Sequence, residues 1–166
     1  MKENFQKLYQ KLCTPITFAE IQDINAALKK IGDFSPDLLS AMQEQLFQRH
    51  WGCLCKLIWA IPDPTPPLFG PILCDLLDNH REIEIMEAVA DAMFSLRDER
   101  AVPSLVGALD HYLVGDADYH FNRKLLYALA NINNGEAVAG LTLALESPEE
   151  LIRRTARKEL ERITKH

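Results

Sequence analysis

The sequence contains little of what β-sheets are usually built from. Valine occurs only five times among 166 residues, whereas leucine occurs 24 times and alanine 17 times. Leucine and alanine favour helices, while β-branched residues such as valine are enriched in strands. The composition therefore predicts an all-α protein. Hydrophobic residues at 48% and charged residues at 25% are typical of a folded globular chain.

The chain also lacks long apolar runs. No stretch approaches the length of about 18 apolar residues that a transmembrane helix needs, so none is expected. Residues 1–13 are amphipathic and carry charges throughout, without the apolar centre and small-residue cleavage site of a signal peptide. We therefore expect no membrane association and a cytoplasmic location.

The chain contains fewer basic than acidic residues. Lys and Arg number 18 against 24 Asp and Glu, which gives a formal net charge of −6. Proteins that coat nucleic acids usually present a basic surface. A phosphate-binding groove is the alternative for the basic residues near the C-terminus, but glutamates share that segment, so we do not expect nucleic-acid binding. The basic residues in question are Arg153, Arg154, Arg157, Lys158, Arg162 and Lys165.

Cysteine pairs and catalytic motifs are absent. The four cysteines form no CxxC pair, and no histidine pair has zinc-finger spacing, so we expect reduced, small apolar side chains at Cys13, Cys53, Cys55 and Cys74. No GxSxG, P-loop, HExxH or GxGxxG motif occurs. Nothing in the sequence pairs two carboxylates in one pocket. We therefore expect no metal, no cofactor and no enzymatic activity.

The sequence does contain a repeat. An apolar residue followed by a turn residue and Asp or Asn ends four segments, at 31–33, 61–63, 96–98 and 132–134, and Ile163 ends a fifth. The intervals are 30, 35, 36 and 31 residues. Before each turn, apolar residues recur at helical spacing, as in Phe121, Leu125 and Ala128. Repeats of this period predict stacked helix pairs.

The periodicity predicts ten helices in five antiparallel pairs, within one domain that covers residues 1–166. Residues 62–67, Pro-Asp-Pro-Thr-Pro-Pro, fall where the repeat already requires a turn, so we interpret them as a rigid turn rather than a linker. The first helices of the pairs are expected at about 4–13, 36–48, 67–77, 101–113 and 136–146, and the second at about 18–31, 50–61, 83–96, 119–132 and 149–164.

Residues 92–105, AMFSLRDERAVPSL, resemble the signature of a HEAT repeat in the short form also seen in phycobilisome-lyase-type proteins. Residues 27–33, ALKKIGD, resemble the same core. The resemblance covers nearly the whole chain. It implies an α-solenoid of about five antiparallel helix pairs, a HEAT-like superhelix whose second helices line a concave groove. The family often pairs an arginine early in the second helix with the turn Asp of a neighbouring repeat, and here only Arg153 occupies that position.

The resemblance and the helical phase together give candidate residues for a partner-binding groove. They form an acidic ridge, a mixed polar and aromatic ridge, and a basic ridge. Tyr127 is the strongest candidate for a hot spot, because Tyr and Arg dominate the binding energy of interfaces. The alternative is that these are ordinary solvated helix faces. The candidates are Glu84, Glu87 and Asp91 in the first ridge, His120, Arg123, Tyr127 and Asn131 in the second, and Arg154, Lys158 and Arg162 in the third.

Two longer intervals place extra residues near 78–81 and 114–120. Insertions in repeat proteins often lie on a contact edge, so Asp116 and Asp118 join the partner-binding candidates. A metal held by these aspartates with His111 and His120 is the alternative, but their spacing is not that of a known metal site, so a solvated loop is expected.

These features predict a non-catalytic protein-binding module that uses its groove and inserted loops. Small acidic stacks of this kind resemble bacterial immunity proteins, so we expect a cytosolic immunity protein that neutralises a cognate, basic toxin domain. One alternative is a chromophore-lyase-type or DNA-glycosylase-type enzyme on the same scaffold, with a pocket near Trp51, Trp59 or Tyr127. Another is an adaptor subunit of a larger complex. We expect Trp51 and Trp59 to fill the core.

Overall fold

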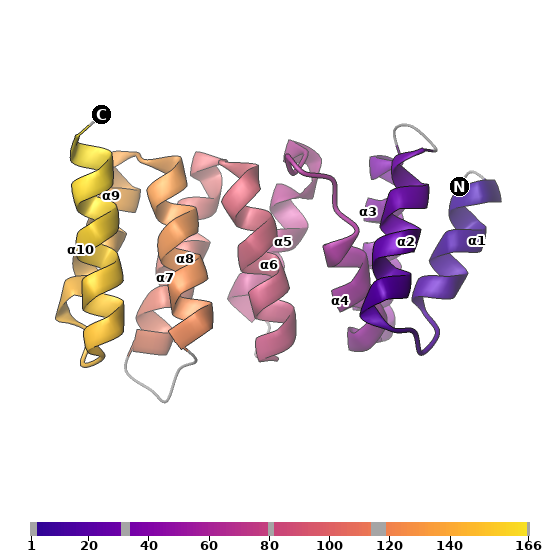
Figure 1. The fold of residues 1–166 in the computed structure, drawn as a ribbon, viewed down its shortest axis with the longest axis horizontal. Helices are drawn as coiled ribbons and strands as arrows, with labels where there is room; N and C mark the ends of the chain where they lie inside the picture. Colours follow the sequence, from indigo (N-terminus) through magenta and orange to yellow (C-terminus); the bar gives the residue numbers. More distant parts are fainter. Residues whose placement is uncertain (1–2, 31–33, 80–81, 114–118, 166) are drawn as a thin grey trace. The chain divides into compact units, whose positions relative to one another are not determined.

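The computed structural model describes residues 3–30, 34–79, 82–113 and 119–165, and in these ranges it holds helices and turns but no strand (Figure 1). The all-α prediction is confirmed. All ten predicted helices are present, with ends that differ from the expected ones by at most three residues. They are α1 (Glu3–Leu12), α2 (Phe18–Lys29), α3 (Ser35–Gln48), α4 (Trp51–Trp59), α5 (Gly70–Asn79), α6 (Ile83–Leu96), α7 (Val102–Leu113), α8 (Tyr119–Ile132), α9 (Gly135–Leu143) and α10 (Glu150–Thr164).

The chain divides into two compact units. Unit 1 covers Met1–Phe69 and contains α1 to α4, and unit 2 covers Gly70–His166 and contains α5 to α10. The proline-rich segment 62–67 lies just before this division. Among the helices of the described ranges, none is long and apolar enough to cross a bilayer.

Unit 1 is built on an aromatic and aliphatic core. Phe5 of α1 is fully buried and its ring stacks on that of Phe34, with 6.4 Å between the centroids. Leu38 and Met42 of α3 and Leu54 of α4 are also fully buried, which accounts for the packing of α3 on α4 and of α1 on both α2 and α4. The apolar spacing read from the sequence is therefore the spacing that is buried.

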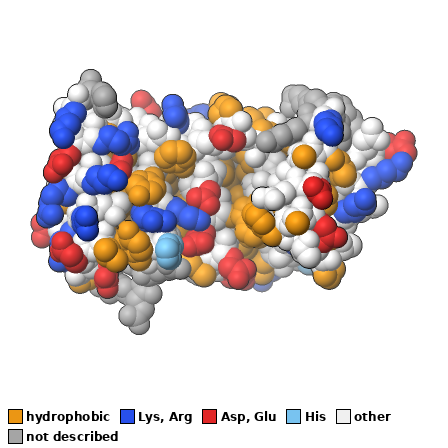
Figure 2. All heavy atoms as spheres, in the orientation of Figure 1, with side chains coloured by type: hydrophobic (Ala, Val, Ile, Leu, Met, Phe, Trp, Pro, Cys, Tyr) orange, Lys and Arg blue, Asp and Glu red, His pale blue; other side chains and the backbone are white. Residues whose placement is uncertain are grey.

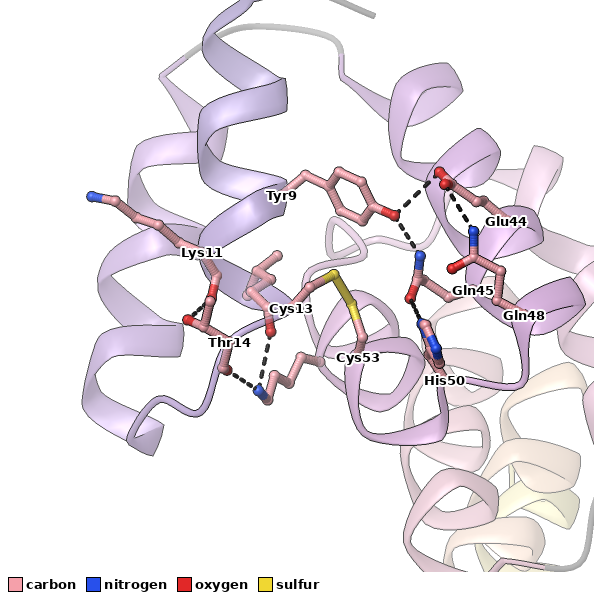
Figure 3. Close-up of a disulfide and its surroundings, with 11 residues drawn as sticks. Tyr9, Lys11, Cys13, Thr14, Glu44, Gln45, Gln48, His50 and Cys53 are labelled. Atoms are coloured by element: carbon pink, nitrogen blue, oxygen red, sulfur yellow. Dashed lines mark hydrogen bonds between the residues drawn. A yellow bond between two sulfur atoms is a disulfide. The ribbon is translucent and has the colours of Figure 1, made fainter.

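A disulfide joins Cys13, which follows α1, to Cys53 in α4 (Figure 3). The prediction that all four cysteines are reduced was therefore wrong for this pair, and it holds for Cys55 and Cys74. The reason is tertiary: the packing of α1 against α4 brings together two residues 40 positions apart. Lys56 of α4 also contacts the end of α1. Its ammonium donates hydrogen bonds to the carbonyl oxygens of Leu12 at 3.0 Å and Thr14 at 2.6 Å.

The prediction that Trp59 is buried was also wrong. It was expected to fill the core, but it is 43% exposed and its ring meets the edge of Phe18, also exposed, at 6.1 Å between centroids. Trp51 is half-buried. Trp59 lies at the last position of α4, where the helix ends, so its side chain leaves the buried stripe that Leu54, Leu57 and Ile58 form.

A capping box fixes the start of α2. The backbone N–H of Glu20 donates to Oγ1 of Thr17, while the carboxylate of Glu20 accepts hydrogen bonds from the backbone N–H of Thr17 at 2.7 Å and from its hydroxyl at 2.8 Å. These bonds stabilise the charged carboxylate, so they lower the pKa of Glu20 below its usual range. The capping stabilisation is therefore present above the unfolded-state pKa of Glu20 and is lost as the pH falls through its lower folded-state pKa.

We predict that Thr17→Ala raises the pKa of Glu20 toward its ordinary value, because it removes the hydroxyl donor and leaves only the backbone N–H. The measurement is an NMR titration of the Glu20 side-chain carboxyl carbon in both proteins. The carboxyl of Glu3, whose partner Lys7 is far from the substitution in sequence, serves as the internal control. An unchanged titration of Glu20 would show that the hydroxyl bond does not form in solution.

Unit 2 consists of three helix pairs, α5 with α6, α7 with α8, and α9 with α10. The second helices α6, α8 and α10 lie side by side in one layer, and α5, α7 and α9 form the layer behind them (Figure 1). The core between the layers includes Val89, Leu105, Phe121 and Leu141, each fully buried. Each pair thus buries its apolar stripe against the next pair.

Within the described part of the chain, the arginine implied by the family resemblance forms no inter-repeat pair. Arg153 forms an ion pair with Glu150 of its own helix and donates hydrogen bonds to the carbonyl oxygens of Ser147 and Pro148. The turn residue Asp98 pairs with Arg100 of its own turn at 2.6 Å, which lowers the pKa of Asp98. In both cases the partner is local in sequence.

Candidate interaction surface

The helices α6, α8 and α10 present the candidate residues on one layer of unit 2. Two hydrogen bonds between helices fix the register. The side chain of Asn131 in α8 donates to the carbonyl oxygen of Phe94 in α6 at 2.6 Å, and Arg162 in α10 donates to the carbonyl oxygen of Ala130 in α8 at 3.4 Å. Equivalent turns of the three helices therefore lie next to each other.

The structure places every described candidate outside the core. The predicted residues of α6, α8 and α10 are all exposed or half-buried, as their helical phase implied. Asp116 and Asp118 lie outside the described residues. In Figure 2, where these three helices face the viewer, basic side chains gather over α10 and continue toward α8.

The acidic ridge of α6 is bound by a lysine that the sequence interpretation missed. The ammonium of Lys124 lies 2.8 Å from Asp91 and 3.6 Å from Glu87, which joins α8 to α6. Lys124 follows His120 by four positions and so belongs to the same helical stripe, which is the signal that would have found it. Two of the three carboxylates proposed to meet a basic partner thus share a cation within the chain.

Arg123 is held between two tyrosines of its own helix. Its guanidinium carbon lies 5.5 Å from the ring centroid of Tyr119 and 5.9 Å from that of Tyr127, one turn away on either side. Cation–π contacts of this kind orient a guanidinium. The Nε atom of Arg123 is buried and has no hydrogen-bond partner among the described residues. Tyr119 was not among the sequence candidates, although its spacing of four from Arg123 equals that of Tyr127.

The basic residues of α10 fall into two groups. Arg153 pairs with Glu150, and Arg162 pairs at 2.7 Å with Glu159, a glutamate that is itself buried. Arg154, Arg157 and Lys158 are exposed and form no ion pair with a carboxylate in the ranges that the structure describes. Arg157 was not among the groove candidates from the sequence, but it lies three positions from Arg154 and so neighbours it on the helix surface.

Charge is strongly segregated along unit 2. Residues 70–152 contain 15 acidic and five basic residues, whereas residues 153–166 contain six basic and two acidic residues. The net charge of −6 therefore does not reveal that an acidic segment, residues 70–152, is followed by a basic segment, residues 153–166. Such a distribution orients an approaching charged partner before contact.

A hollow of about 370 Å³ lies at α5 and α7 and includes Asp78, Asp110, His111 and Tyr112 in its lining. The enzymatic alternative expected a pocket near Trp51, Trp59 or Tyr127, and none of these three lines this hollow. In the part of the chain that the structure describes, no three His, Cys, Asp or Glu residues are placed to hold a metal ion.

Comparison with known proteins gives no assignment. No protein-family model matches the chain, and no curated protein is significantly similar to it.

Proposed function

We propose that this chain is a non-catalytic protein-binding module that contacts its partner through the exposed face of α6, α8 and α10. The observation that carries the proposal is the Tyr119–Arg123–Tyr127 stack, an oriented arginine between two half-buried tyrosines near the middle of the face. Tyr and Arg are the residue types most enriched at binding hot spots. Because they sit on a packed helix, little conformational entropy is lost when a partner binds.

We also propose that the helix pairs are HEAT-like repeats of an α-solenoid. Within unit 2, each pair packs on the next, and the second helices form one continuous layer. This packing and the repeat of thirty-odd residues support the proposal. Repeat proteins commonly bind partners along such a layer.

Neutralisation of a cognate toxin is the narrower biological role that we propose, and the acidic balance of residues 70–152 supports contact with a basic domain. The Cys13–Cys53 disulfide weighs against the cytosolic version of this role, because cytosolic thiols are usually kept reduced. The redox state of Cys13 and Cys53 in cells therefore indicates in which compartment the protein resides.

We predict that Tyr127→Ala weakens binding of the physiological partner at least tenfold, or by about 1.4 kcal/mol. The partner is first captured in cells by a photo-crosslinking amino acid at Phe94 or Leu151, which are exposed on α6 and α10. Binding is then measured with both purified proteins by calorimetry. A captured toxin would, in addition, arrest growth when expressed alone and lose this effect beside the wild-type chain.

Phe47→Ala is the matched control, because Phe47 is 89% exposed and lies on α3 of unit 1. It should leave the affinity unchanged, and a crosslinker at position 47 should not capture the partner. Circular dichroism shows whether Tyr127→Ala is folded. If the folded variant binds as tightly as the wild type, this face is not the interface and the proposed function fails.

A further inference from the structure

Four cations of α8 and α10 form no ion pair with a carboxylate of the described residues. We define them as the cationic patch, which consists of Arg123, Arg154, Arg157 and Lys158. We propose that this cationic patch receives an acidic segment of the partner protein, an inference that rests on the proposed function. The segment supplies carboxylates that pair with cations left without an ion pair among residues 3–30, 34–79, 82–113 and 119–165. The established register of α8 and α10 brings the turns that carry these side chains next to each other.

The basic residues of α10 differ in whether they form ion pairs. Arg153 pairs with Glu150 and Arg162 pairs with Glu159, both on the same helix. Arg154, Arg157 and Lys158 remain exposed, and Glu161, on the same helix, forms no ion pair with any of them. Three adjacent like charges on one turn repel each other, and an external anion relieves that repulsion.

The geometry of Arg123 also supports the proposal. The rings of Tyr119 and Tyr127 orient its guanidinium, and its Nε is buried. The terminal nitrogens of a guanidinium donate strong, charge-assisted hydrogen bonds to a carboxylate. An acidic side chain of the partner would thus pair with the terminal nitrogens of an arginine that is already oriented.

The patch itself favours an acidic segment over the other charge classes, whatever basic surface of the partner contacts the acidic residues elsewhere in unit 2. A basic segment would compete with Lys124 for Glu87 and Asp91. A nucleic acid binds by neutralising many phosphates along its length. The unpaired cations of α10 span only residues 154–158, or about 6 Å along the helix, and the acidic segment of unit 2, residues 70–152, lies beside them. A short acidic peptide segment fits this patch better than a long polyanion.

The test uses the full-length protein and three fluorescent probes: a short peptide rich in glutamate, its glutamine counterpart, and a single-stranded oligonucleotide of equal charge. Fluorescence anisotropy should show the glutamate peptide binding about tenfold or more tightly than the other two at low salt, with the affinity falling as salt rises. The variant R154E/K158E should lose at least tenfold in affinity for that peptide. The control K7E/K11E makes the same change in net charge on α1 of unit 1 and should stay within about twofold of the wild type.

Three outcomes overturn the inference: equal binding of the glutamate and glutamine peptides, tighter binding of the oligonucleotide, or an equal loss in both double variants. If the peptide fails while Tyr127→Ala still weakens the captured partner, only the acidic class of partner is rejected and the proposed function stands. Support requires, in addition, that replacing the acidic segment of the captured partner by glutamines removes its sensitivity to R154E/K158E.

Discussion

Loss of the Cys13–Cys53 disulfide should lower the free energy of unfolding of unit 1 by about 4 kcal/mol. This is the chain-entropy value for a loop closed between residues 40 positions apart. The loop contains α2 and α3, which gain conformational freedom in the unfolded state when the bond is absent. A unit of this size has a net stability of only about 5–10 kcal/mol, so the loss is a large share of it.

The effect should be confined to unit 1. Hydrogen exchange should show lower protection in α1 to α4 after reduction, and unchanged protection in α6, α8 and α10 of unit 2. Lys56 continues to bind the carbonyl oxygens of Leu12 and Thr14, so the end of α1 keeps part of its order. The C13S/C53A variant should behave like the reduced protein and should not respond to reductant. Equal stability of the oxidised and reduced proteins would contradict the prediction.

The same pair reports the compartment in which the chain works. Alkylation under denaturing conditions that quench the cells at once should modify only Cys55 and Cys74 if the protein resides in an oxidising compartment. Modification of all four cysteines would restore the cytosolic version of toxin neutralisation. The toxin proposal and its location are therefore separable by one mass measurement.

The helices were predictable because their signals are local. Apolar spacing of three and four, as in Phe121, Leu125 and Ala128, requires only that one face of each helix be buried, and these residues are fully buried. The disulfide was not predictable from spacing, because the proximity of Cys13 and Cys53 follows from the packing of α1 on α4. A sequence alone does not say which helices are neighbours.

For the candidate surface, too, the local features could be predicted from the sequence, whereas the contacts between helices could not. Helical phase correctly placed Glu87, Asp91 and Tyr127 outside the core. Phase does not give the distance between helices, so the sequence interpretation missed that Lys124 of α8 reaches both carboxylates of α6. Two carboxylates of α6 thus share a cation within the chain, whereas Arg154, Arg157 and Lys158 of α10 form no ion pair with a described residue.

Gly140 and Gly107 should respond to alanine in opposite directions. A Cβ atom at Gly140 would lie 2.7 Å from Cγ2 of Val106 and 3.3 Å from Cδ1 of Leu129, because α9 approaches α7 and α8 closely at this point. Overpacking of this kind costs about 1–3 kcal/mol, which exceeds the gain of about 1 kcal/mol from replacing a helical glycine. Apart from its chain neighbours and its own helix backbone, a Cβ atom at Gly107 meets no atom within 4 Å, so Gly107→Ala should stabilise the protein by about 0.5–1 kcal/mol. Urea unfolding followed by circular dichroism measures both changes.

A substitution at Val106 tests whether the close approach of α7 and α9 causes the expected cost of Gly140→Ala. Val106 is half-buried, and its Cγ2 is the atom that a Cβ at position 140 would strike first. Val106→Ala removes that methyl group, so Gly140→Ala should cost less in the V106A background than in the wild type, and the double-mutant cycle should give a favourable coupling of about 1 kcal/mol. An equal cost of Gly140→Ala in the two backgrounds would mean that α7 and α9 are further apart in solution, and that the layer behind α6, α8 and α10 is less tightly packed than the structure shows.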